Sequence, residues 1–428
     1  MTRCRAHRQE ARLAGRRLLA VLVVLACAQA TPALVPVEQT GRVSVVANPA
    51  NPRRVWVGDP VARRSALVDL DTGRLLGTVP GGMGISAPLL PRTRSELYMP
   101  ATYYSRGSYG KRTDVLAIYG ASSLRSIGEV LLPPKRANFG FDSGAAALSD
   151  DDRFAAIFNL TPATSLSIVD VETRKLTGEI PTPGCSLAYS AGARHFLSLC
   201  ANGSLLDVRL DEAGRKQALR RSKPFFDPES DPVMEKGVRW RNQWLFVSFE
   251  GIVHPIDVAG PTSRFLPTWS LLSKEDREDS WRVGGLKNLA VHERSGRLYS
   301  LVHQGGPDTQ KASGSEIWVY DLATHKRIQR IQVVSAGLTY MALPMEFGER
   351  WPWPLNRLVR WLISSIPTGA GEVQVTQDEQ PLLVTTANVS GGLAVYDAQS
   401  GDFMRRIYTG NYSNMSLQVT SGWTGAAP

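Results

Sequence analysis

The sequence lacks the short motifs that mark common catalytic, metal and cofactor centres. Its 428 residues contain only 4 cysteines and 6 histidines. No cysteines are spaced C-x-x-C and no histidines are spaced H-x-x-x-H, which argues against the usual zinc, thiol-redox and covalent haem sites. A G-x-S-x-G turn and a phosphate-binding Walker loop are also absent. Any chemistry that this protein supports is therefore not encoded in a local motif.

A long hydrophobic run is missing as well. The most apolar stretch, Leu18–Ala28, has about eleven residues, too few to span a bilayer. It follows an arginine-rich start and ends in Ala28-Gln29-Ala30, the small-residue pattern of a cleavage site. We therefore predict that residues 1–30 are a signal peptide. General secretory export is preferred over the twin-arginine route that Arg16-Arg17 weakly suggests.

Positive charge is concentrated in this leader. The whole chain has a formal net charge of +10. Residues 1–30 contain six arginines and one glutamate, a surplus of five, so the mature chain carries only +5. This modest excess does not indicate a nucleic-acid-binding protein, and we predict no nucleic acid partner.

Two of the four cysteines, Cys4 and Cys27, lie in the leader and leave with it. Cys185 and Cys200 remain, fifteen positions apart, in a chain that is predicted to be exported. Turn residues such as Gly184 flank them, so we expect the two cysteines to face each other across adjacent strands. The sequence predicts a structural disulfide that stabilises the fold by about 3 kcal/mol, rather than a redox pair.

One phrase, an apolar strand that ends in Asp or Tyr before a turn, recurs seven times. Its copies are Leu67-Val68-Asp69, Ala117-Ile118-Tyr119, Ile168-Val169-Asp170, Leu205-Leu206-Asp207, Pro255-Ile256-Asp257, Trp318-Val319-Tyr320-Asp321 and Ala394-Val395-Tyr396-Asp397. The spacing runs from roughly 37 to 76 residues and is most often about 50. Repeated strands and turns at this period predict an all-β protein, a seven-bladed β-propeller.

A single propeller accounts for residues 31–428, because seven blades of about 50 residues use nearly the whole mature chain. We expect Val43–Asn48 to supply the outer strand that closes the ring, since closure removes exposed strand edges. Ser273-Lys274-Glu275-Asp276 is a capping-box start, which predicts a short helix over Ser273–Ser280.

A second helix is predicted inside an insert at about 338–371, between blades six and seven. From Trp351 to Ile366 the apolar residues recur at helical spacing, while Arg357 and Arg360 lie off that stripe. Packing on the propeller surface is the favoured interpretation of this basic amphipathic helix. Contact with a membrane surface or a partner is the alternative.

Other polar residues are interpreted as structural. The recurring Asp at one position of each blade is expected to accept turn hydrogen bonds rather than to act in catalysis. Gly81-Gly82-Met83-Gly84 follows Pro80 and precedes no helix, so it is expected to connect two blades. The mature chain's histidines are scattered, and we predict no metal site, although a propeller channel could gather distant residues.

One loop is a better candidate for binding. Residues 101–114 place three tyrosines (Tyr103, Tyr104 and Tyr109) and three cations (Arg106, Lys111 and Arg112) between two strands of blade two. Long loops on rigid scaffolds often carry binding residues, and aromatic and arginine side chains are typical interface anchors. An ordinary solvated hairpin is the competing interpretation.

The same hairpin resembles the corresponding hairpin of the heavy subunit of methylamine and aromatic amine dehydrogenases. Similar segments follow in order along nearly the whole mature chain. They are Thr102–Arg106 with Gly110–Asp114, Gly184-Cys185 with Cys200 and Gly203–Leu205, Phe265–Pro267 with Trp281–Gly285, and Gln377–Leu383. The sequence is therefore identified as similar to this family.

The resemblance implies the heavy subunit of a periplasmic heterotetramer of two heavy and two light subunits. In that family the small, cysteine-rich light subunit carries tryptophan tryptophylquinone and the catalytic base. The enzyme oxidises a primary amine to an aldehyde and ammonia and passes the electrons to a blue-copper protein. The heavy subunit binds no cofactor and supplies no catalytic residue. It holds the light subunit and lines part of the substrate channel.

The resemblance also implies site residues. Tyr103, Tyr104, Arg106 and Arg63 are expected to contact the substrate channel or the light subunit, with Tyr104 as a channel wall. The sequence departs from the family at two places: Arg63 and Arg64 stand in a loop where the methylamine enzyme has an aromatic channel residue, and the insert is additional. The alternative function is a non-catalytic periplasmic propeller that acts as a binding scaffold, possibly at a membrane surface through Trp351–Ile366.

Overall fold

The computed structural model describes residues 45–85, 87–138, 145–334, 369–386 and 392–420. The predicted signal peptide, the helix predicted at Trp351–Ile366 and most of the predicted insert lie outside these residues. In the part of the chain that is described, no helix combines the length and the hydropathy needed to cross a membrane.

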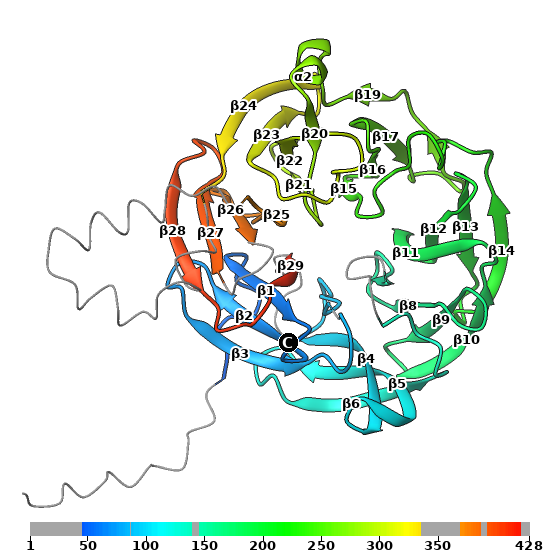
Figure 1. The fold of residues 1–428 in the computed structure, drawn as a ribbon. Helices are drawn as coiled ribbons and strands as arrows, with labels where there is room; N and C mark the ends of the chain where they lie inside the picture. Colours follow the sequence, from blue (N-terminus) through cyan, green and yellow to red (C-terminus); the bar gives the residue numbers. More distant parts are fainter. Residues whose placement is uncertain (1–44, 86, 139–144, 335–368, 387–391, 421–428) are drawn as a thin grey trace, which may run out of the picture. The chain divides into compact units, whose positions relative to one another are not determined.

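The described chain forms seven small antiparallel sheets arranged in a ring (Figure 1). The predicted seven-bladed β-propeller is therefore confirmed. Blades one to four contain β29 (Met415–Val419), β1 (Arg54–Asp59), β2 (Arg64–Asp69) and β3 (Leu75–Pro80); β4 (Glu96–Arg106), β5 (Tyr109–Gly120) and β6 (Ser126–Leu132); β7 (Ala146–Leu148), β8 (Phe154–Asn159), β9 (Ser165–Asp170) and β10 (Lys175–Pro181); and β11 (Cys185–Gly192), β12 (His195–Cys200), β13 (Leu205–Leu210) and β14 (Lys216–Arg221).

The other three blades follow the same plan with small additions. They contain β15 (Val238–Trp240), β16 (Gln243–Val247), β17 (Ile252–Asp257), β18 (Arg264–Phe265) and β19 (Trp269–Ser270); β20 (Trp281–Val283), β21 (Leu289–His292), β22 (Arg297–Gln304), β23 (Glu316–Asp321) and β24 (Lys326–Gln332); and β25 (Glu372–Val375), β26 (Leu382–Thr386), β27 (Gly392–Asp397) and β28 (Phe403–Tyr408). In blade two, Leu89 pairs with Tyr98 in place of an innermost strand.

The seven copies of the recurring phrase lie on equivalent strands. Each lies on the third strand from the centre of its blade: β2, β5, β9, β13, β17, β23 and β27. The copy in blade four begins its strand, so the turn prediction is wrong for Asp207: its carboxylate contacts His195 and Ser263, and Asp211 accepts the turn hydrogen bonds. In other blades an Asp at the end of the strand accepts the turn hydrogen bonds that the sequence predicts. For example, Asp170 Oδ1 accepts the backbone N–H groups of Glu172 and Thr173, each at 3.0 Å.

The hydrophobic core lies between neighbouring blades, and burial falls from the middle of each sheet to its outer edge. Every residue of β8 and β9 is buried, whereas every residue of β14 is exposed. Residues of β1 and β2 such as Val55 and Val68 pack with Val384 and Val395 of β26 and β27. This apolar contact joins the first blade to the last, because the two sheets pack face to face as in a β-sandwich.

The predicted closing strand is wrong. Residues 45–48 form no strand, and residues 43 and 44 lie outside the described part of the chain. Instead the C-terminal strand β29 pairs with β1, with Val55 opposite Val419 and Trp56 opposite Gln418. The ring therefore closes at its inner strand, because the alternating segment Met415–Val419 can bury Leu417 beside the first blade.

The short predicted helix is confirmed. Helix α2 (Lys274–Glu278) begins after Ser273, whose hydroxyl accepts the backbone N–H of Asp276 at 3.1 Å. The Asp276 carboxylate accepts the backbone N–H of Ser273 at 2.8 Å, which completes the capping box. The helix lies in the connection between blades five and six (Figure 1).

Candidate functional site

The hairpin of blade two is the most extended element of the described chain. β4 has 11 residues and β5 has 12, and their pairing runs from Glu96 opposite Gly120 to Arg106 opposite Tyr109. The inner half of both strands is buried, but most side chains beyond Thr102 are partly or fully exposed. The predicted binding loop is therefore a two-stranded arm whose tip reaches beyond the packed part of its blade.

Aromatic and cationic side chains cover this arm. Tyr103 is 38% exposed and Tyr109 is 61% exposed, while Tyr104 is half-buried. The guanidinium carbon of Arg106 lies 5.8 Å from the centre of the Tyr109 ring, within the range of a cation–π contact. Partial burial of Tyr103 raises the pKa of its hydroxyl, so this tyrosine stays neutral at physiological pH.

Arg63 of blade one reaches the tip of the same arm. It lies in the connection between β1 and β2 with a positive φ of 55°, and its Nη1 donates to the Gly107 carbonyl at 3.3 Å. Arg63 thus contacts the tip of the arm that carries Tyr103, Tyr104 and Arg106, although the hydrogen-bonded residues are 44 positions apart.

A buried ionic cluster lies at the base of the arm. Thr102 and Asp114, which are opposite each other in register, are both fully buried. Arg112 holds Asp114 with two contacts, from Nε at 2.9 Å and from Nη2 at 2.8 Å. Asp114 also accepts the Thr102 hydroxyl at 2.8 Å and the Arg136 backbone N–H at 2.9 Å. These contacts fix the angle at which the arm leaves the blade.

Arg136 gives this cluster an uncompensated charge. Its side chain is 2% exposed, its Nε donates to Thr102 Oγ1 at 3.2 Å, and its Nη1 donates to the Ala137 carbonyl at 3.2 Å. Its Nη2 is buried and has no hydrogen-bond partner. Burial lowers the pKa of Arg136 to about 10 although Asp114 opposes the shift, so the guanidinium stays charged at neutral pH. Asp114 is therefore bound by the Arg112 guanidinium and by the backbone of Arg136, whose own guanidinium forms no ion pair among the described residues.

Sequence reasoning missed this cluster. Arg112 was recognised only as one of three cations in the loop, and Arg136 follows two prolines in a segment without any functional signal. The alignment of Thr102 with Asp114 could have been derived from the hairpin register, because residues directly opposite each other contact on the same face of a sheet. The position of Arg136 could not, because it comes from the next connection along the chain.

The glycine-rich segment 81–84 passes close beside the cluster. Gly82 has a φ of +69°, and a Cβ at this position would lie 2.6 Å from the Thr102 carbonyl oxygen. The backbone N–H of Met83 donates to that same carbonyl at 2.7 Å. The segment is a connection from blade one to blade two, as its sequence context indicates, and glycine allows it to approach the arm.

All seven blades have the same up-and-down strand order, so connections between second and third strands lie at one end of the ring. We call this the hairpin end. The predicted disulfide is confirmed there: Cys185 of β11 is bonded to Cys200 at the end of β12, and the two are register partners. β24 also terminates at this end.

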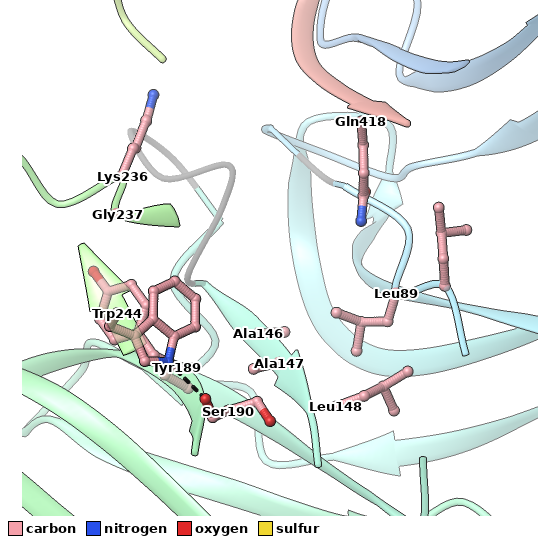
Figure 2. A pocket seen from close by; sticks show the side chains of 12 residues that line it. Leu89, Ala146, Ala147, Leu148, Tyr189, Ser190, Lys236, Gly237, Trp244 and Gln418 are labelled. Atoms are coloured by element: carbon pink, nitrogen blue, oxygen red, sulfur yellow. Dashed lines mark hydrogen bonds between the residues drawn. The ribbon is translucent and has the colours of Figure 1, made fainter. Parts of the chain in front are cut away.

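A separate pocket lies at the centre of the ring (Figure 2). Its volume is about 240 Å³, and Leu89 and Trp244 form opposite walls. The Trp244 indole N–H donates to the Ser190 carbonyl at 2.7 Å. The innermost segments of several blades contribute to it: Leu89, Leu90, Ala146, Ala147, Leu148, Ala188, Tyr189, Ser190, Lys236, Gly237, Trp244 and Gln418. None of the four predicted contact residues lines this pocket.

The histidines do not converge. His195 Nε2 lies 2.7 Å from Asp207 Oδ1, His292 Nδ1 lies 2.8 Å from Ser295 Oγ, and the His325 ring stacks on Trp269. Among the described residues no three His, Cys, Asp or Glu side chains gather in a way that could hold a metal ion. The arm presents aromatic and cationic side chains, which are residue types typical of interface anchors.

Comparison with known sequences identifies relatives along most of the chain. Residues 51–337, more than half of it, match the family described as methylamine dehydrogenase heavy chain (MADH). The methylamine dehydrogenase heavy chain of Methylorubrum extorquens is 27% identical over 317 residues, covering 72% of this chain and 77% of that protein. The heavy chain of Paracoccus versutus is 25% identical, with coverage of 83% and 76%.

Comparison with solved structures supports the fold. Dihydro-heme d1 dehydrogenase matches with a TM-score of 0.53 at 16% identity, covering 91% of this chain and 79% of that chain. A functionally unknown protein from Desulfotomaculum acetoxidans matches with a TM-score of 0.52 at 12% identity, with coverage of 86% and 98%. These likenesses concern the fold alone. The match over residues 51–337 decides the family: the chain belongs to the methylamine dehydrogenase heavy chain family.

Proposed function

We propose that this chain is the heavy subunit of a periplasmic, quinone-dependent amine dehydrogenase. The chain scaffolds a small, cysteine-rich light subunit and lines part of the channel through which a primary amine reaches it. The observation that carries the proposal is the family match over residues 51–337. The exposed arm at the hairpin end supports it, because a protruding aromatic and cationic surface on a rigid ring suits stable docking.

The light subunit is assigned the tryptophan tryptophylquinone, which when present oxidises the amine to an aldehyde and ammonia and sends the electrons to a blue-copper protein. The residues of this chain bind and orient. Tyr103 and Tyr104 are proposed as apolar walls, and Arg63 and Arg106 as contacts with the partner. Both cysteines of the mature chain form its own disulfide, so they are not available for bonds to the light subunit.

Co-expression provides the test. A tagged version of this chain is produced in a periplasm together with the cysteine-rich exported polypeptide encoded beside it. The expected product is a complex of two heavy and two light subunits with quinone absorbance in the visible range and amine-dependent reduction of a dye. The matched control is the same chain expressed alone, which we expect to be folded, colourless and inactive.

Recovery of a colourless, inactive single chain from the co-expressing cells contradicts the proposal. That result favours the alternative function, a propeller that serves as a binding scaffold without catalysis. If the complex is active, a panel of primary amines of increasing size gives the substrate class, because channel walls select mainly by fit.

A further inference from the structure

Six cations gather at the hairpin end of blades one and two. We call this group the basic patch; it consists of Arg63, Arg64, Arg106, Lys111, Arg112 and Arg136. Arg63, Arg106 and Lys111 are exposed, and within the described residues none of these three forms an ion pair. Arg64 donates to the neutral oxygens of Gly410 and Asn411, at 2.9 and 3.4 Å.

Two carboxylates beside these cations are already engaged by other groups. Asp114 is shared by Arg112 and the backbone of Arg136. Asp59 is 1% exposed and accepts three backbone N–H groups, from Val61 at 3.1 Å, Ala62 at 3.0 Å and Tyr412 at 2.8 Å. Neither carboxylate pairs with Arg63, Arg106 or Lys111, so the positive charge of these exposed side chains is unbalanced.

Other arginines of the ring do have carboxylate partners. At the opposite end, Arg153 lies 3.3 Å from Asp170, and Arg264 lies 2.7 Å from Asp257. At the hairpin end of another blade, Arg330 lies 2.7 Å from Glu316. The exposed cations of the basic patch differ from these arginines because they have no such partner among the described residues.

The unbalanced charge restricts what can cover the arm. A partner that placed only apolar surface there would remove water from several cations without replacing it, which is costly. A partner with carboxylates would replace the lost solvation by charge-assisted hydrogen bonds and would also be attracted over a distance. Tyr103 and Tyr109 supply exposed aromatic area between the cations, as is common at the centre of protein interfaces.

We propose that the basic patch docks an acidic surface of the cysteine-rich light subunit, an inference that rests on the proposed function. The buried Arg136, whose guanidinium forms no ion pair among the described residues, supplies a fixed positive charge under the contact. The exposed Arg63, Arg106 and Lys111 make the direct ion pairs. Electrostatic complementarity of this kind sets the orientation of the light subunit on the ring and speeds its association.

Charge reversal tests the inference in the heavy–light complex. The variant Arg106→Glu/Lys111→Glu reverses two exposed charges on the arm. The matched control Lys216→Glu/Arg220→Glu makes the same change in charge on β14, which is fully exposed on the outside of blade four. The dissociation constant of the purified light subunit for each immobilised heavy chain is measured at about 50 and about 300 mM salt, where screening differs strongly.

The arm variant is expected to bind the light subunit about 100-fold more weakly than the wild type at low salt, and to lose most of the salt dependence. The control variant is expected to behave like the wild type. The conservative variant Arg106→Lys/Lys111→Arg, which keeps both charges, is expected to retain most of the affinity.

Two outcomes overturn the inference in distinguishable ways. If the wild type assembles with the light subunit and the arm variant binds as tightly as the control, the acidic docking surface is refuted while the proposed function stands. If the wild-type chain does not bind the light subunit at all, both are refuted. Thermal unfolding of each variant alone shows whether a loss of binding comes from misfolding of the arm.

Discussion

Asp114 forms an ion pair with the half-buried Arg112 and accepts the backbone N–H of the buried Arg136, and its neutralisation should destabilise the propeller. The Asp114→Asn variant keeps the size of the side chain but removes its charge. It also places an amide N–H₂ group among donors, since Arg112, Thr102 and the Arg136 backbone all donate to Asp114. Two buried or half-buried cations would then lack any counter-charge.

The size of the effect follows from the burial of the groups. Removing one partner of a buried ion pair typically costs about 3–5 kcal/mol. The Asp114 side chain is 0% exposed, but that of Arg112 is 22% exposed, so solvent screens part of the loss. We therefore expect a loss near the lower end, about 3 kcal/mol, which corresponds to a decrease in Tm of about 3–4 °C for a domain of this size.

Equilibrium urea unfolding and thermal unfolding measure this loss. Ser108→Ala at the exposed tip of the arm is the control and should change stability by less than about 0.5 kcal/mol. The double variant Asp114→Asn/Arg112→Met removes one of the stranded cations and should be less destabilised than the sum of the two single variants. If Asp114→Asn is as stable as Ser108→Ala, the two guanidinium groups do not depend on this carboxylate and the reasoning fails.

Three further predictions concern other parts of the ring. Replacing Cys185 and Cys200 by serine should lower the free energy of unfolding by about 3 kcal/mol, and reductant should then have no further effect on thermal unfolding. Gly82→Ala should destabilise by more than about 1 kcal/mol and make the arm sensitive to proteolysis, because φ is +69° and the added Cβ would collide with a backbone oxygen; unchanged proteolysis would contradict this. The hydroxyl and backbone N–H of Thr324 hold the pKa of Asp321 below its usual range. The difference in the free energy of unfolding between wild type and Asp321→Ala should therefore have its full size above about pH 4 and vanish as the pH falls through the lowered pKa. A difference that persists in urea titrations at lower pH would contradict this.

Local sequence signals were sufficient to predict the blades. The strand phrase that ends at Asp170, Asp321 or Asp397 carries its own turn, because the carboxylate accepts backbone N–H groups two and three residues further along. Ser273 with Asp276 likewise predicts a helix start from neighbouring residues alone. Seven such strands at a regular spacing leave a closed ring as the arrangement that buries their apolar faces.

Ring closure was not predictable in this way. The sequence analysis expected Val43–Asn48 to close the ring, but β29 does so from the other end of the chain. Both segments contain alternating apolar residues, so periodicity does not distinguish them. The choice depends on which segment can pair with β1 while burying its apolar face between the first and last blades, and only the assembled ring presents that space.

The candidate site, too, was predictable from the sequence only in part. Composition alone marked Tyr103, Tyr104 and Arg106 as an exposed aromatic and cationic surface, because strands and turns place such residues on a hairpin whatever the rest of the chain does. The contact of Arg63 with Gly107 and the position of Arg136 beside Asp114 required the tertiary structure. Those pairs join segments from different blades or connections, and only the packing of one blade against the next sets their distance and their burial.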